Sequence, residues 1–95
     1  MSISQDTQKK YEILSAMALL NKPTLADIVH ATGIASSTVK RQIGLLRKEY
    51  RMDLQFIREA TGKRGKSGYY IIVDWGIINP KEFLKEFGSY AALLK

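Results

Sequence analysis

The sequence has no cysteine, a single histidine and no apolar run long enough to span a membrane. Without cysteine the chain forms no disulfide and offers no thiolate to a metal, which suits the cytoplasm, where we expect this protein. His30 has no second histidine with which to share a zinc ion, so we expect no metal site. The apolar run of residues 13–20 is far shorter than the ~20 residues of a transmembrane helix, so no membrane partner is expected.

The motifs of common enzyme classes are also missing. No pair of acids suited to hydrolysis, no nucleophile elbow and no dinucleotide-binding fingerprint is present. Residues 60–67 (ATGKRGKS) differ from the phosphate loop G-x-x-x-x-G-K-[ST] only at the first position. A phosphate loop leads into a helix, whereas residues 69–74 (YYIIVD) are typical of a strand. We therefore expect neither an enzyme nor a cofactor.

Positive charge is in excess, and it is confined to one part of the chain. The net charge is +6 over 95 residues, a length that predicts one small domain, residues 1–95. The rest of the chain outside residues 36–68 is neutral, and this concentration favours a polyanionic partner. Against three acids, residues 36–68 hold nine bases: Lys40, Arg41, Arg47, Lys48, Arg51, Arg58, Lys63, Arg64 and Lys66.

Helical periodicity predicts two helices in the first part of the chain. Residues 6–20 have apolar side chains at helical spacing, with Ser4 or Asp6 as the N-cap. Thr24 begins a second helix with a capping-box arrangement. Gly33 ends it, because glycine readily takes the left-handed conformation of a helix exit.

A third helix is expected over residues 36–50, capped by Ser36 or Ser37. One face is apolar, and about one third of the circumference on the opposite side carries a serine, a glycine and three cations. We call this opposite side the basic stripe; it comprises Ser37, Lys40, Arg41, Gly44 and Lys48. Glycine weakens a helix interior by about 1 kcal/mol relative to alanine. Close approach to a nucleic-acid backbone or tight packing against a neighbouring element would each explain Gly44, and the sequence leaves both open.

After Arg51 the apolar period changes from helical to two, which predicts a β-hairpin over residues 53–74. Its loop, residues 61–68 (TGKRGKSG), has three cations and three glycines. A last helix is expected over residues 80–94, with Asn79 as N-cap and a proline in the first helical position. Its apolar side either completes the core of a monomer or forms a homodimer interface, which we expect to involve Phe83, Phe87, Tyr90 and Leu94.

Residues 24–50 (TLADIVHATGIASSTVKRQIGLLRKEY) resemble the helix-turn-helix of winged-helix transcription regulators of the IclR and MarR types. The segment Ser36-Ser37-Thr38-Val39 is similar to the S-x-S-T-V entry of many recognition helices. The resemblance covers residues 6–74 and implies an α+β winged helix-turn-helix fold, with a three-helix core and a two-stranded β-hairpin wing. The helix over residues 80–94 lies outside the shared pattern. The other matching positions are Leu25, Ile28, Gly33, Ile34 and Val39.

These features predict a sequence-specific double-stranded DNA-binding transcription regulator without a small-molecule effector. The helix over residues 36–50 would enter the major groove, and the loop over 61–68 would follow the backbone or the minor groove. Arg41 is the strongest candidate for a guanine contact, whereas Thr38, Arg47 and Lys48 are expected on phosphates. The full candidate set is Ser36, Ser37, Thr38, Lys40, Arg41, Arg47, Lys48, Lys63, Arg64 and Lys66.

Three other interpretations stay open at this point. The same fold can serve as a protein–protein adaptor that does not bind DNA. Tyr69 and Tyr70 could stack the bases of a single strand, although strand alternation is expected to bury at least one of them. The loop over residues 61–68 could also be a solvated hairpin tip. An adaptor has no need of cations that converge on one face, so the salt dependence of DNA binding separates it from a DNA-binding protein.

Overall fold

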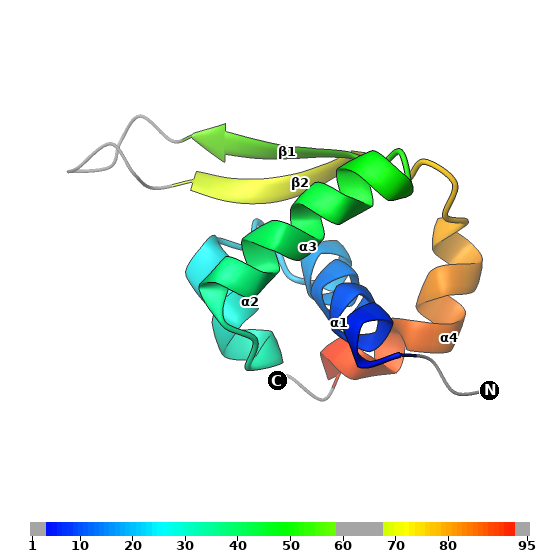
Figure 1. The fold of residues 1–95 in the computed structure, drawn as a ribbon, viewed down its shortest axis with the longest axis horizontal. Helices are drawn as coiled ribbons and strands as arrows, with labels where there is room; N and C mark the ends of the chain where they lie inside the picture. The colour runs from blue at the N-terminus through cyan, green and yellow to red at the C-terminus, as the bar shows by residue number, and fades with distance from the viewer. Residues whose placement is uncertain (1–3, 59–67, 93–95) are drawn as a thin grey trace.

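The computed structural model describes residues 4–58 and 68–92, with side chains as far as residue 87 in the last helix. Its elements are α1 (Gln5–Leu19), α2 (Leu25–Thr32), α3 (Ser36–Glu49), β1 (Asp53–Arg58), β2 (Gly68–Asp74) and α4 (Pro80–Ala92). Helix α1 lies in the middle, and α2, α3 and α4 pack around it while the hairpin runs along α3 (Figure 1). Over the described residues the fold is therefore α+β, with four helices and one two-stranded antiparallel sheet. Within the described residues, none of the helices has both the length and the apolar character needed to cross a bilayer.

A single apolar core joins these elements. The apolar sides predicted for the first three helices face one another, and the base of the hairpin closes the core between α3 and α4. Each fully buried aliphatic side chain contributes about 1.5–3 kcal/mol of transfer free energy, so this cluster is the main source of stability. Its members are Ile13, Leu14, Met17, Ile28, Ile34, Val39, Ile43, Leu46, Met52, Leu54 and Phe83.

The helix ends that depend on local hydrogen bonds agree with the sequence prediction. Ser4 caps α1, where its Oγ accepts from the Thr7 amide at 3.1 Å. Thr24 and Asp27 form the capping box of α2, each side chain accepting from the other's amide at 3.0 Å. Gly33 follows α2 at φ +72°, the left-handed conformation that favours glycine. These caps satisfy amides and carbonyls that a helix leaves unpaired at its ends.

The start of α3 differs from the prediction. The N-cap is Ala35, and no side chain caps this helix. Ser36 and Ser37 instead form its first turn, and both are exposed. The first hydrogen bond of the helix runs from the Val39 amide to the Ala35 carbonyl at 2.9 Å, so the helix begins at Ser36. The two serine hydroxyls are thus not used as caps.

The hairpin has the predicted antiparallel pairing, with Leu54 opposite Ile72 and Arg58 opposite Gly68. Strand β2 begins at Gly68, one residue before the predicted start. A Cβ atom at this position would overlap the Phe56 ring and the Ile57 carbonyl oxygen, so only glycine fits the pairing. The predicted loop over residues 61–68 otherwise lies outside the described residues.

The side chains of the hairpin are less buried than alternation predicted. Leu54 is in the core, but Phe56, on the same face, is 38% exposed because this face meets the core only near its base. Tyr70 packs edge-on against Phe56, with ring centroids 5.0 Å apart. The expectation that alternation buries Tyr69 or Tyr70 is wrong, since both are only half-buried.

Helix α4 packs on α1, and this places most of one predicted interface residue in the core. Asn79 caps the helix, its Oδ1 accepting from the Glu82 amide at 3.1 Å. Phe83 is only 5% exposed and contacts Tyr11 edge-on at 5.5 Å, so it mainly completes the core. Phe87 is half-buried beside it. The Tyr90 side chain and Leu94 lie outside the described residues.

Candidate nucleic-acid interface

Helix α3 presents one side to the core and the other to solvent. Its buried residues are Val39, Gln42, Ile43 and Leu46. All five members of the basic stripe are exposed, from Ser37 near the start of the helix to Lys48 near its end. The stripe is therefore not covered by another part of the described chain, and its cations are accessible to an external anion.

The hairpin runs alongside α3 (Figure 1). Lys40 lines a cleft of about 480 Å³ together with Phe56, Gly68 and Tyr70 of the two strands. The Arg47 Nε donates to the Leu54 carbonyl at 2.8 Å, which ties α3 to β1. The two strands beyond the hairpin base and the Lys40 side of α3 thus line one cleft. The predicted tip cations, Lys63, Arg64 and Lys66, lie outside the described residues.

Arg47 has a structural role that the sequence did not predict. Its hydrogen bond to the Leu54 carbonyl occupies the Nε donor, whereas the side chain as a whole remains exposed. The terminal amino groups of its guanidinium can still donate to another acceptor. Loss of Arg47 would therefore disturb the junction of α3 and β1 as well as any anion contact.

The first turn of α2 also borders the cleft, a contribution that sequence reasoning missed. Thr24, Leu25 and Ala26 line it opposite the strands. The Tyr70 amide donates to the Pro23 carbonyl at 2.9 Å, which holds β2 against the start of α2. A helix N-terminus carries a partial positive charge. The α2 N-terminus and Lys40 line the same cleft, although they are distant in sequence.

The start of α3 is open to an acceptor from outside. Ser36 and Ser37 are exposed, and in the part of the chain that the structure describes no side chain caps the first turn of the helix. Thr38 is half-buried at the side of the same turn. Hydroxyl donors and uncapped amides at one end, with the Lys40 and Arg41 cations one turn further on, suit a phosphate or a base edge.

Arg41 has an acidic neighbour on another helix. Its Nη2 lies 3.5 Å from the Asp6 Oδ1 of α1, and both side chains are about half exposed. Asp6 thus places a carboxylate beside the basic stripe. Periodicity could not reveal the pair, because the two residues are 35 positions apart and meet only through the packing of α1 on α3.

Gly44 lies in the middle of the basic stripe, and a Cβ atom there would meet no neighbouring atom within 4 Å. This excludes tight packing as the reason for glycine. The open side of the helix is the side that would face a groove, where a missing side chain shortens the approach.

Gly44→Ala is expected to stabilise the fold by about 0.5–1 kcal/mol, because alanine has the higher helix propensity and its methyl group meets no neighbour. If α3 lies close to a DNA backbone here, the same change lowers duplex affinity several-fold. Urea denaturation and duplex titration of one preparation measure both effects. Higher stability with unchanged duplex affinity would contradict the groove-facing explanation.

His30 and the carboxylates offer no metal site in the described part of the chain. His30 is exposed in the last turn of α2. Asp27 is engaged in the capping box of the same helix. Among the residues described, no three potential metal-ligating side chains come together.

Comparison with known proteins finds a likeness in fold. No protein-family model matches the chain, and no curated protein matches it. The structure is similar to the crystal structure of a DUF2131 family protein from Shewanella amazonensis SB2B, with a TM-score of 0.71 and 20% sequence identity. The match covers 97% of this chain and 94% of that one. The chain is thus an α+β protein whose fold has a solved counterpart.

Proposed function

We propose that this protein is a winged-helix transcription regulator that binds double-stranded DNA sequence-specifically, without catalytic activity. Helix α3 enters the major groove with the basic stripe toward the bases. The loop of the hairpin follows the adjacent backbone or minor groove. The observation that carries the proposal is the exposed basic stripe of α3 beside the hairpin, with Lys40 on their shared surface.

The dimensions and chemistry of α3 support this role. An α-helix with its side chains is ~10–12 Å across and fits the major groove, which is ~12 Å wide. Ser36 and Ser37 at its start are short hydrogen-bonding residues that can approach base edges. Arg41, a turn further on, matches the O6 and N7 acceptors of guanine, and Lys48 near the other end reaches toward the flanking phosphates.

The cleft beside α3 supplies a phosphate site in the same proposal. Lys40 and the first-turn residues Leu25 and Ala26 line one cleft. A backbone phosphate seated there would receive a point charge and the positive end of a helix dipole together. Such a contact fixes the position of α3 in the groove and leaves sequence discrimination to Arg41 and the serines.

The experiment that tests this function is selection of bound duplexes from a random pool by the purified protein. Titration of the selected duplex at several salt concentrations then gives the number of phosphate contacts, since log K falls by about 0.9 per contact per log unit of salt. We expect enrichment of a defined sequence and a steep salt slope. Binding weaker than ~10⁻⁴ M for every duplex at low salt would reject the proposal.

We extend the proposal to a two-fold homodimer through the surface beside α4. Tyr11, Ile77 and Phe87 line a groove of about 270 Å³ there, and Ile77 is 68% exposed. Exposed bases and acids alternate along α4, at Lys81, Glu82, Lys85 and Glu86, so those of two copies can pair around a two-fold axis.

Such a dimer predicts two selected half-sites about one helical turn apart, ~34–36 Å. Sedimentation of the free protein gives its mass. A monomer that selects a single half-site would contradict the dimer and leave the groove open to another protein.

A further inference from the structure

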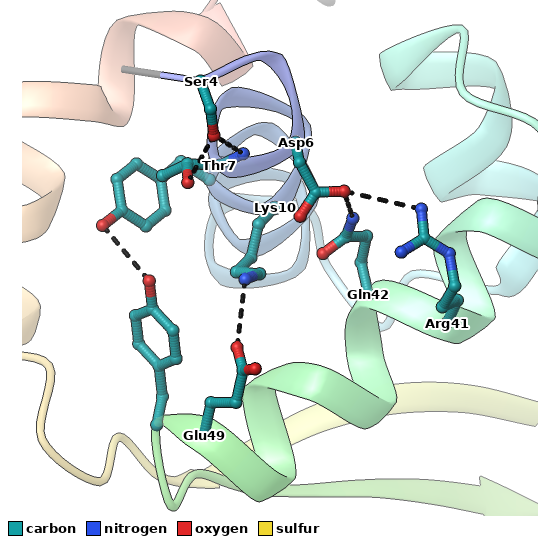
Figure 2. Close-up of polar contacts among 9 residues, drawn as sticks. Ser4, Asp6, Thr7, Lys10, Arg41, Gln42 and Glu49 are labelled. Atoms are coloured by element: carbon teal, nitrogen blue, oxygen red, sulfur yellow. Dashed lines mark hydrogen bonds and ion pairs between the residues drawn. The ribbon is translucent and has the colours of Figure 1, made fainter. Parts of the chain in front are cut away.

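We propose that Asp6 is a positioning residue that aims Arg41 at a base and withholds it from phosphates, so that Asp6 sets sequence specificity. This inference rests on the proposed function and assigns a role to a residue of α1, outside the recognition helix. The starting observation is the Asp6 carboxylate at the edge of the basic stripe (Figure 2).

The carboxylate of Asp6 is itself held in place. Its Oδ1 accepts from the Gln42 Nε2 at 2.7 Å, and Gln42 is fully buried. The same oxygen accepts from the Arg41 Nη2 at 3.5 Å. A short bond to a buried amide and a longer bond to an exposed guanidinium mean that Asp6 stays in position whether or not Arg41 is bound to it.

The first turns of α1 are anchored to α3 by further polar contacts (Figure 2). Lys10 is buried, and its Nζ lies 3.4 Å from the Glu49 Oε1. The Tyr11 and Tyr50 hydroxyls are 3.5 Å apart, and this hydrogen bond, with burial, raises the pKa of Tyr11 to about 12. Both pairs join α1 to the C-terminal half of α3, whereas Asp6 joins it to the middle. The distance of Asp6 from the stripe is therefore set by the packing of two helices.

The geometry leaves Arg41 able to bind Asp6 and a base together. The contact with Asp6 uses one terminal amino group, and the other N–H groups of the guanidinium fork remain for a guanine. A phosphate lies at the groove edge rather than its floor, so Arg41 must leave Asp6 to reach one. Asp6 also repels a phosphate directly. The carboxylate thus supports the specific complex and opposes the non-specific complex.

The test is Asp6→Asn, because asparagine keeps an oxygen for the buried Gln42 amide while it removes the charge. Two probes are titrated: the selected duplex and a random-sequence duplex of equal length. We expect affinity for the selected duplex to fall about threefold, and affinity for the random duplex to rise by a similar factor, so their ratio falls about tenfold. The salt slope on the random duplex should steepen by about 1, for one added phosphate contact.

Two control variants separate positioning from charge alone. Glu12→Gln makes the same change of charge further along α1, and should leave the affinity ratio unchanged. In an Arg41→Ala background, Asp6→Asn should also leave the ratio unchanged, since there is no arginine to position. Equal gains on both duplexes from Asp6→Asn, or an undiminished effect without Arg41, would overturn the inference.

The free protein supplies a readout that does not depend on DNA. The ¹⁵Nε relaxation of Arg41 should report a more restricted side chain in the wild type than in Asp6→Asn. Equal mobility in the two proteins would overturn the role of Asp6, even if the wild type binds its duplex specifically. Failure of the wild type to bind any duplex would instead overturn the proposed function.

Discussion

Replacing Lys40 and Arg41 together by alanine is expected to lower affinity for the selected duplex by about 10²-fold or more, with little loss of stability. Arg41 is the proposed guanine contact, worth about 1–3 kcal/mol, and Lys40 the phosphate contact in the cleft. Neither side chain is in the core, and the exposed pair of Arg41 with Asp6 contributes about 1 kcal/mol or less. Fluorescence anisotropy at fixed salt measures the affinity, and thermal unfolding measures the stability.

The matched control is the replacement of Lys9 and Lys22 by alanine. Both are exposed and lie outside α3 and the hairpin, so the net charge changes by the same amount elsewhere on the molecule. We expect this control to lose only a few-fold in affinity, through long-range attraction. Equal losses of affinity from the two pairs would mean that binding follows net charge alone and that α3 is not the DNA-contacting helix.

Gly76→Ala is expected to destabilise the fold by about 3 kcal/mol or more. Gly76 has φ +60°, where an L-residue is strained by about 1–2 kcal/mol. A Cβ atom would also overlap the backbone carbonyl of Tyr50 and the backbone of Arg51. These atoms form the junction of α3 and β1, and the Ile77 amide donates to the same Tyr50 carbonyl at 3.0 Å. Since backbone cannot move aside as a flexible side chain can, the added methyl group forces the junction apart.

The identical substitution at Gly44 provides the contrast for Gly76→Ala. Gly44 lies inside α3, and a Cβ atom there would meet no neighbouring atom, so alanine is expected to stabilise the fold at this position. Urea denaturation of both variants should shift the midpoint in opposite directions with unchanged m-values. A Gly76→Ala protein as stable as the wild type would mean that the segment between β2 and α4 repacks without cost.

The parts of the fold that depend on near neighbours could be predicted from the sequence. Thr24 and Asp27 cap each other across three residues, and Asn79 caps α4 over the same spacing. Gly33 ends α2 through its own backbone conformation. Each of these features is decided within one helical turn, so the local pattern contains the necessary information.

Features that depend on a distant partner were the ones that the sequence left open or missed. The sequence allowed Phe83 of α4 in the core or at an interface, and in the structure its ring packs against Tyr11 of α1. The sequence placed Gly68 in the loop, whereas in the structure it belongs to β2 and the Phe56 ring fills the space that a side chain would need. Ser36 reads as a cap, but the start of α3 is set by the bond between Val39 and Ala35 beside the buried Ile34.

By itself, the sequence determined the helices and strands, the concentration of cations over residues 36–68 and the division of α3 into a buried and a basic side. The tertiary structure alone decided that the basic stripe is open, that Lys40 adjoins the hairpin and that Asp6 lies against Arg41. The physical reason is that periodicity reports how side chains are arranged around one element. The contacts between elements depend on how their whole surfaces pack together, and a local pattern does not contain that information.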